Sequence, residues 1–319
     1  MSKVTPKIDL SDYYNKIKKT KPVIKGFVKK VTGSMVIHAS LPNAKIGEIC
    51  TIETKTPIQA QIIGFDNEDV FLTPLGPLEN IGPKTVVINT GKTLEVPVGK
   101  DLLGRVLDCL GKPIDDKGNI TAEDYYPVKR KAPSAMERKR IDKRLETGVR
   151  TIDLFTTIGQ GQRIGVFSTA GVGKSSLLAM LARSSTADVN VLALVGERGR
   201  EVLEFIEDTL GEEGLKRSVL VVSSSDETPL RRVTAAYTAT AIAEYFRDEG
   251  KNVMLLMDSV TRFGRALREI ALSLGEPPAR QGFPPSVFAA LPELLERAGN
   301  MENGSITGCL LYTSPSPRD

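Results

Sequence analysis

Residues 163–181 say most about the fold and function of this chain, because they place a glycine-containing turn between an apolar run and a helical pattern. The run Ile164–Phe167 predicts a buried strand, and Ser176–Arg183 predicts a helix. Gly171 and Gly173 permit a sharp turn between them, with backbone N–H groups pointing inward as in phosphate-binding loops. The helix N-terminus behind the turn favours anions. The stretch therefore predicts a nucleotide site.

The same loop supplies side chains suited to a nucleoside triphosphate. Lys174 is placed to reach the β- and γ-phosphates, and the Ser175 hydroxyl is placed to coordinate Mg²⁺. The usual pattern begins with glycine where Ser168 stands, which makes the turn less permissive. An ordinary strand-to-helix loop with a solvated Lys174 is the alternative. The predicted phosphate-binding residues are Ser168, Thr169, Ala170, Gly171, Val172, Gly173, Lys174, Ser175 and Ser176.

Length and composition indicate a cytoplasmic protein of about two domains. The 319 residues contain no apolar run of transmembrane length, and residues 1–10 lack the apolar centre of a signal peptide. The cysteines Cys50, Cys109 and Cys309 have no metal-ligand spacing, so we expect ordinary packing residues.

Basic charge gathers in two segments. Residues 1–30 hold nine lysines against two aspartates, and residues 129–144 hold eight basic against two acidic side chains, although the whole chain carries only +4. Such clusters indicate contact with partners or anionic lipid, or simply solvated lysines at a flexible end. Leu10, Tyr14 and Ile17 have helical spacing, which predicts a short amphipathic helix that docks on a partner or folds back on its own domain.

The pattern of strands and turns predicts an α/β protein in five segments. Residues 1–22 form a basic helix or tail, and the short strands of 23–98 form a small closed β-barrel. Residues 99–150 connect it to alternating strands and helices in 151–308, where continuous apolar strands predict a mostly parallel sheet covered on both faces. Residues 309–319 form a tail.

The one histidine and one basic segment suggest further roles, as a catalytic base and as a nucleic-acid contact. His38, the one histidine, lies among apolar neighbours and is expected to be a satisfied barrel residue rather than a base. The basic run near the adjacent Tyr125 and Tyr126 could contact nucleic acid. Aromatic residues make up only 5% of the chain, and no RNA-binding signature interleaves them. We therefore expect no nucleic-acid partner.

Acidic residues follow two of the predicted parallel strands, at the edge where ligands of such sheets bind. Asp258 ends the run Val253–Met257 and is expected to organise Mg²⁺ together with Ser175; a helix N-cap is the alternative. Glu197 is expected to polarise the water that attacks the γ-phosphate. A solvated salt-bridge cluster with its neighbours in GERGRE is the alternative for Glu197.

Two arginines complete the candidate chemistry. Arg262 follows Asp258 by one helical turn and is placed to contact the γ-phosphate, and Arg198 is a weaker candidate. The predicted catalytic residues are thus Lys174, Glu197 and Arg262.

From about residue 23 to about 307 the chain resembles the catalytic subunits of the rotary ATPase superfamily, most closely the protein export ATPases of bacterial flagella and type III secretion systems. The stretches that carry this resemblance include GVRTID, GQGQRIGVFSTAGVGKSSLL, LVGERGREVLEF, the run from DETPLRR to LLERAGN, and GSIT. The resemblance implies a β-barrel followed by a RecA-like ATP-binding domain, and a Mg²⁺-dependent ATPase assembled as a homo-hexamer with ATP between subunits. It also implies that the N-terminal helix contacts a regulator and stalk protein, and that the enzyme serves export substrates and chaperones at the cytoplasmic face of the export apparatus.

The flagellar subfamily ranks first and the injectisome second. QGFPPSVFAALP resembles the flagellar version, whereas Ser168-Thr169 differs from the pair frequent there. A non-catalytic rotary ATPase subunit usually lacks the glutamate that Glu197 supplies. An RNA translocase similar to the Rho terminator should present an RNA-binding face on its barrel, and none is found.

The last eleven residues, CLLYTSPSPRD, resemble translated sequencing-adapter read-through, which implies an artefactual tail and an incomplete RecA-like domain. Without that resemblance, CLLY reads as a strand end and SPSPRD as a disordered tail. In the family the missing part includes an arginine finger and groups that hold adenine. An arginine finger is worth about 10³–10⁵ in rate, so we expect this chain to bind nucleotide weakly and to hydrolyse it very slowly.

Overall fold

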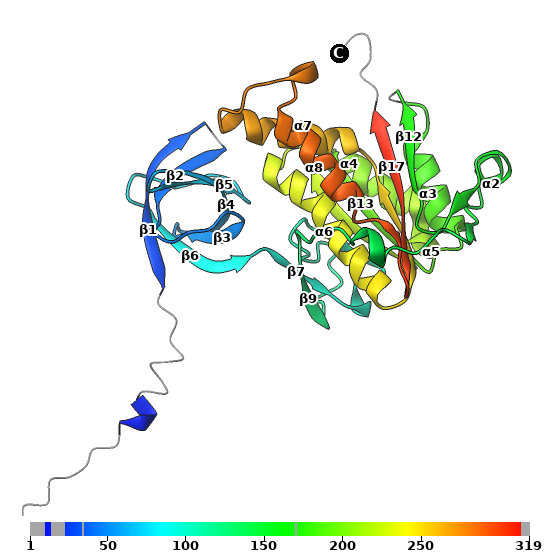
Figure 1. Ribbon diagram of the computed structural model, residues 1–319, viewed down its shortest axis with the longest axis horizontal. Helices are drawn as coiled ribbons and strands as arrows, with labels where there is room; N and C mark the ends of the chain where they lie inside the picture. The colour runs from blue at the N-terminus through cyan, green and yellow to red at the C-terminus, as the bar shows by residue number, and fades with distance from the viewer. Residues whose placement is uncertain (1–9, 14–22, 34, 170, 314–319) are drawn as a thin grey trace, which may run out of the picture.

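The structure is a computed structural model that describes residues 10–13, 23–33, 35–169 and 171–313. It places a small barrel beside a larger α/β domain (Figure 1). Residues 11–13 form a helical turn, whereas Tyr14 and Ile17 of the predicted amphipathic helix lie outside the described residues. Among the helices of the described ranges, none has the length and apolar character needed to cross a bilayer.

The barrel consists of six antiparallel strands in the closed order β1-β2-β5-β4-β3-β6. Strand β4 shows how the barrel interior is filled. Ile58, Ala60 and Ile62 point into the buried interior, while the residues between them face outward. Closure leaves no unpaired edge. The strands are β1 Ile24–Thr32, β2 Val36–Ser40, β3 Glu48–Ile52, β4 Ile58–Asp66, β5 Asp69–Pro74 and β6 Val86–Thr93.

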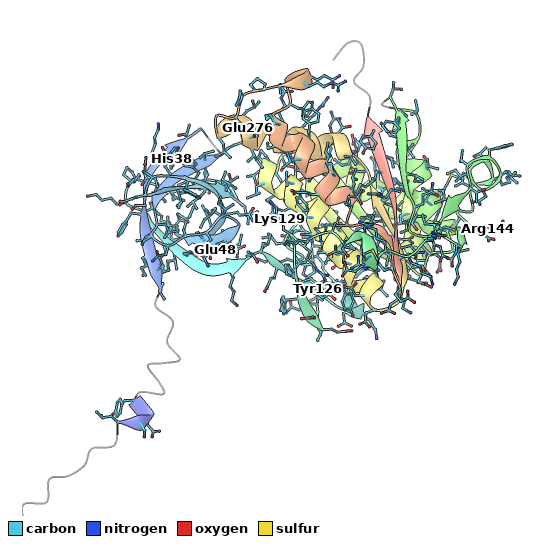
Figure 2. The ribbon with its side chains drawn as sticks, in the orientation of Figure 1. His38, Glu48, Tyr126, Lys129, Arg144 and Glu276 are labelled. Carbon is cyan, nitrogen blue, oxygen red and sulfur yellow. The ribbon has the colours of Figure 1, made fainter. Side chains whose placement is uncertain are left out.

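His38 lies in this barrel, as predicted (Figure 2). Its ring meets the Phe71 ring edge-on with the centroids 4.8 Å apart, and its Nε2 lies 3.1 Å from the Thr32 hydroxyl. The expected barrel boundary at residue 98 differs from the observed one. The barrel ends at Thr93, because β7 (Glu95–Val98) pairs with β9 (Asp124–Pro127) outside it.

The larger α/β domain is built on a mostly parallel sheet in the order β12-β17-β15-β13-β14-β8, with β16 pairing antiparallel to β17. Two strands come from segments to which the sequence assigned other roles. Strand β8 belongs to the expected connecting region but forms an edge of the sheet, and residues 309–313 of the expected tail complete β17. The strands are β8 Arg105–Leu107, β12 Arg163–Ser168, β13 Val189–Glu197, β14 Ser218–Ser224, β15 Asn252–Met257, β16 Gly299–Asn300 and β17 Ser305–Thr313.

Helices cover both faces of this sheet, as the continuous apolar strands predicted (Figure 1). Along β13 the first eight residues are buried, and they alternate between two cores. Val191 and Ala193 pack in the core that includes α6 (Pro229–Asp248) and α7 (Val260–Ser273). Leu192 and Leu194 pack in the core that includes α3 (Lys174–Ser184). A strand buried on both faces cannot show the alternation of β4.

The remaining elements are short or lie around this framework. They are α2 Arg150–Phe155, α4 Gly199–Glu204, a π-helical turn Phe205–Leu210, α5 Gly211–Lys216, α8 Pro285–Leu295, the 3₁₀ turns Lys100–Leu102, Ala135–Glu137 and Arg280–Gly282, and the paired strands β10 Arg144–Leu145 and β11 Ile158–Gly159.

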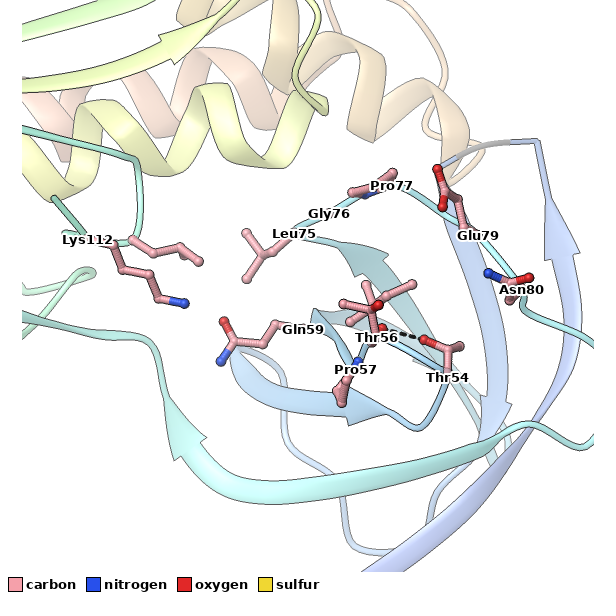
Figure 3. A pocket seen from close by; sticks show the side chains of 12 residues that line it. Thr54, Thr56, Pro57, Gln59, Leu75, Gly76, Pro77, Glu79, Asn80 and Lys112 are labelled. Atoms are coloured by element: carbon pink, nitrogen blue, oxygen red, sulfur yellow. Dashed lines mark hydrogen bonds between the residues drawn. The ribbon is translucent and has the colours of Figure 1, made fainter. Parts of the chain in front are cut away.

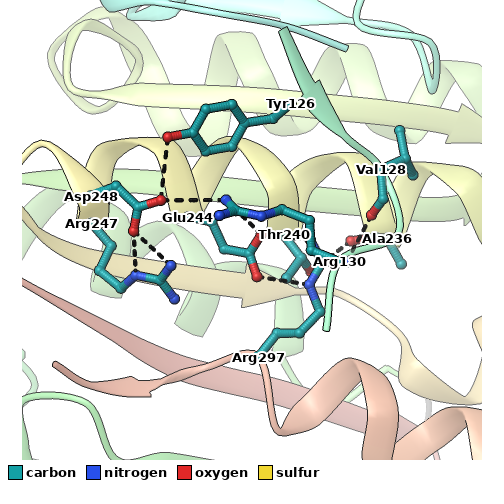
Figure 4. Close-up of polar contacts among 9 residues, drawn as sticks. All are labelled: Tyr126, Val128, Arg130, Ala236, Thr240, Glu244, Arg247, Asp248 and Arg297. Carbon is teal, nitrogen blue, oxygen red and sulfur yellow. Dashed lines mark hydrogen bonds and ion pairs between the residues drawn. The ribbon is translucent and has the colours of Figure 1, made fainter. Parts of the chain in front are cut away.

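Two arginines join parts of the chain that are distant in sequence. Arg297 and Glu244 form a buried pair that fixes the segment after α8 to α6 (Figure 4). Arg231, near the start of α6, donates to Leu75 O of the barrel at 3.1 Å and to Asp108 Oδ2 at 3.2 Å. Arg231 therefore links the barrel, the connecting region and the nucleotide domain.

Candidate functional site

The predicted phosphate loop lies between the end of β12 and the start of α3. Gly171 and Gly173 have φ of 78° and 86°, a left-handed conformation that favours glycine. Lys174 is the first residue of α3, and its Nζ donates to Ser168 O at 3.2 Å. The lysine therefore folds back over the loop. Ala170 lies outside the described residues.

Four of the predicted phosphate-binding residues line a cavity of about 400 Å³, and the residues expected at two other strand ends line it too. Parallel strands β12, β13 and β15 bring their carboxyl ends to one edge, where α/β sheets bind ligands. Ser168, Thr169, Val172 and Ser176 are not among the lining residues. The lining consists of Gly171, Gly173, Lys174, Ser175, Leu178, Glu197, Glu201, Asp258, Arg262 and Leu311.

Asp258 follows β15 directly, and only 9% of its surface is exposed. Its Oδ1 accepts a hydrogen bond from Val195 N at 2.9 Å, whereas its buried Oδ2 has no hydrogen-bond partner among the residues that the structure describes. Burial, followed by the charge of Glu197, raises the pKa of Asp258 well above its usual range. The helix cap proposed as the alternative is supplied by Ser259, whose side chain accepts from Arg262 N.

An unpaired buried carboxylate oxygen beside the Ser175 hydroxyl suits a hard cation such as Mg²⁺. Within the ranges that the structure describes, no three His, Cys, Asp or Glu side chains gather as a metal-binding cluster. That agrees with Mg²⁺ chemistry, because this ion is usually held by one or two protein oxygens together with water and substrate phosphates. The residues present therefore fit a Mg²⁺–nucleotide site.

Glu197 ends β13 and faces Arg262 of α7, with Oε1 2.5 Å from Arg262 Nη1. Burial acts to raise the pKa of Glu197, but hydrogen bonding with Glu201 and the Arg262 guanidinium outweigh it and hold the pKa below its usual value. Glu197 is thus a carboxylate at neutral pH. Burial and the Arg262 charge lower the pKa of Lys174.

The salt-bridge cluster considered for GERGRE is formed by the neighbours of Glu197. The Arg198 side chain is 80% exposed and pairs with Glu201 at 3.6 Å, and Arg200 pairs with Glu204 at 2.7 Å. Arg198 does not line the cavity, whereas Glu201 does. Sequence reasoning did not assign Glu201 to the site, although its place in the first turn of the helix that follows Glu197 was the available signal.

A second cavity, of about 300 Å³, lies between the barrel and the turn at Lys112 (Figure 3). Its lining includes the uncharged side chains of Thr54, Thr56 and Gln59, and its charged groups are Glu79 and Lys112. It lacks a phosphate loop and a carboxylate at a strand end, so the candidate chemistry belongs to the first cavity.

Comparison with known proteins agrees with this architecture. The nucleotide-binding domain of the ATP synthase alpha/beta family matches residues 148–316, and the β-barrel domain of that family matches residues 28–91. The assembled ATPase EscN, solved with its central stalk EscO from the enteropathogenic E. coli type III secretion system, superposes with a TM-score of 0.85 at 44% identity. The match covers 91% of this chain and 71% of that one.

Curated relatives carry two kinds of name. The type 3 secretion system ATPase of Sinorhizobium fredii is 49% identical over 288 residues, which are 89% of this chain and 64% of the relative. The flagellum-specific ATP synthase of Bacillus subtilis is 49% identical over 306 residues, which are 94% of this chain and 67% of the relative. The chain thus spans 64% of the first of these proteins and 67% of the second. With both domains matched in order and the site residues at the strand ends, the chain belongs to the ATP synthase alpha/beta family.

Proposed function

We propose that the whole protein to which this chain belongs hydrolyses ATP to ADP and phosphate and thereby energises protein export. The observation that carries the proposal is the meeting of Glu197 and Arg262 at 2.5 Å in the cavity that Lys174 and Ser175 also line. A carboxylate and two cationic side chains around one cavity match what phosphoryl transfer to water requires.

Each side chain has a distinct role in this proposal. The loop amides and Lys174 hold the β- and γ-phosphates, and Ser175 and Asp258 hold Mg²⁺. When bound, Mg²⁺ neutralises charge on the phosphate oxygens. Glu197 orients the attacking water and accepts its proton as the water oxygen bonds to the γ-phosphorus and the bond to the β,γ-bridging oxygen breaks. Arg262 holds Glu197 in place and contacts the γ-phosphate.

The test is Glu197→Gln in the whole protein. Glutamine keeps the shape but cannot accept the proton, so kcat should fall by about 10²–10⁴ while nucleotide affinity changes little. Glu213→Gln is the matched control, because Glu213 lies on α5 with 86% of its side chain exposed and should leave phosphate release unchanged. Hydrolysis that survives Glu197→Gln nearly intact would refute the assignment.

For the biological role we propose protein export by the flagellar type III apparatus, with the injectisome as the second candidate. Relatives of both names support export in general, and QGFPPSVFAALP favours the flagellar system. By analogy with EscN, which was solved assembled and with its central stalk EscO, the proposal includes a stalk partner that contacts residues 1–30 and assembly of several copies, for which the family resemblance implies a homo-hexamer. It also places the protein in the cytoplasm, at the face of the export apparatus, with export substrates, their chaperones and anionic lipid as further contacts.

Disrupting the gene distinguishes the two export systems. Loss of flagellar filaments with other secretion intact supports the flagellar role. Intact filaments with loss of effector secretion would assign the protein to an injectisome instead.

A further inference from the structure

The carboxyl end of β13 contains one residue more than β14 can pair. The pairing passes from Val195 opposite Ser223 directly to Glu197 opposite Ser224, which leaves Gly196 as the extra residue. Gly196 has φ of 72°, in the left-handed region. A bulge of this kind re-aims the side chain that follows it. It therefore turns Glu197 toward the candidate site.

Two arginine side chains fill the space in front of Gly196. A Cβ atom at this position would lie 3.1 Å from Arg262 Cδ and 3.7 Å from Arg232 Cδ. The first distance is tighter than ordinary van der Waals contact, so any side chain here would push Arg262 away. Glycine thus lets Arg262 cross the strand end to Glu197, and the stem of Arg232 lies against the same glycine.

Arg232 also contacts the helix that carries Arg262. It extends from α6, and its Nη2 lies 2.8 Å from Glu269 Oε2 on α7. Glu269 follows Arg262 by seven residues, which is about two helical turns, so both lie on the same face of α7. The Arg232 side chain is only 16% exposed. Glu269 neutralises Arg232 and Glu197 neutralises Arg262, so two like charges can share the space at Gly196.

The start of α6 is tied to the same strand end. Ser225 N donates to Glu197 O at 3.0 Å, and the Thr228 side chain caps α6 by accepting from Arg231 N. The backbone of Glu197 and the helix that presents Arg232 are therefore held together through a short loop.

We propose that Arg232 is a positioning residue, whose stem packs beside that of Arg262 over Gly196 and confines Arg262 to the arrangement that meets Glu197. The inference deepens the proposed ATP hydrolysis and rests on it, because Arg262 and Glu197 matter for rate only if they act on the γ-phosphate. It assigns the effect to the stem of Arg232 rather than to its charge. Substitutions of Arg232 that keep the aliphatic part of the side chain should therefore have a higher kcat than substitutions that remove it.

The kinetic test compares Arg232→Ala with Arg232→Met in the whole protein. Removing the stem should lower kcat for Mg²⁺-ATP by about 10- to 100-fold with little change in KM, because the misplaced group acts in the transition state. Methionine keeps an unbranched stem and should retain kcat within about threefold. Equal kcat in the alanine and methionine variants, or a rise in KM alone, overturns the inference.

A structural readout separates this inference from the proposed function. In crystals of this chain, Arg232→Ala should break the ion pair between Arg262 and Glu197, and Arg232→Met should retain it. A retained pair in Arg232→Ala overturns the inference whether or not ATP is hydrolysed. If the wild-type whole protein releases no phosphate, the proposed function fails instead. Arg232→Ser, whose side chain ends at the γ position and so lacks the δ carbon that lies near Gly196, takes the place of Arg232→Ala if thermal unfolding shows that the alanine variant does not fold.

Discussion

Replacing Arg297 by methionine should destabilise the nucleotide domain strongly. The side chains of Arg297 and Glu244 are only 1% and 2% exposed, and both guanidinium–carboxylate contacts measure 2.8 Å. Arg297 also donates to Val128 O at 2.8 Å (Figure 4). After the substitution, the one cationic partner left to Glu244 within the described part of the chain is the more distant Arg130, at 3.5 Å.

The expected loss follows from leaving a buried carboxylate without its main partner. Breaking a buried pair from one side costs about 3–5 kcal/mol. In a domain of about 150–250 residues each kcal/mol lowers Tm by about 2–4 °C, so Tm should fall by roughly 6–20 °C. Since the chain has no tryptophan, urea and thermal unfolding are best followed by far-UV circular dichroism.

A double variant tests the cause. Arg297→Met with Glu244→Leu removes both charges and should recover most of the loss, because well-packed apolar groups replace buried pairs at little net cost. Lys216→Met is the matched control. It breaks the ion pair between Lys216 and Glu213, whose side chains are 67% and 86% exposed, and should leave the midpoint of unfolding unchanged. A loss below about 1 kcal/mol in Arg297→Met, or a double variant no more stable than the single one, would refute this reasoning.

Three further predictions concern acid stability, the phosphate loop and the metal. Burial acts to raise the pKa of Asp115, but the Arg105 guanidinium and backbone N–H groups outweigh it and hold the pKa well below its usual value. The stabilisation that ionised Asp115 provides is therefore present at neutral pH and is lost as pH falls below about 4. Asp115→Asn should flatten the dependence of the urea-unfolding midpoint on pH between about 6 and 3. An unchanged slope would contradict this. Gly173→Ala should weaken binding of a fluorescent ATP analogue by about 5- to 30-fold, because φ of 86° costs an alanine about 1–2 kcal/mol. Gly82→Ala, in open space, should not change that affinity. Chelating Mg²⁺ with EDTA should abolish ATP hydrolysis by the whole protein and weaken nucleotide binding less, and hydrolysis that persists in EDTA would exclude the role given to Asp258.

The features that depend on local spacing along the chain could be predicted before the fold was known. The loop from Ser168 to Ser175 is recognisable because a turn with left-handed glycines needs its residues in a fixed local order. The barrel strands follow from alternation and turn residues, and the parallel sheet follows from apolar runs separated by helices. Glu197 and Asp258 could be assigned to one edge because parallel strands end on the same side.

Contacts between segments that are far apart in the sequence become visible in the folded structure. Local patterns can indicate a strand at residues 309–312, but they cannot show that this strand lies between β12 and β15, or that β8 pairs with β14. Three contacts join residues on separate elements. Glu197 pairs with Arg262, the side chain of Arg232 lies near Gly196, and Arg231 bonds to both Leu75 and Asp108. Such contacts depend on side-chain packing and burial after the chain has folded, whereas spacing and propensity act within a few residues. The sequence therefore predicted the glycine loop, and the fold brought Arg262 to Glu197, the carboxylate for which we propose the role of general base.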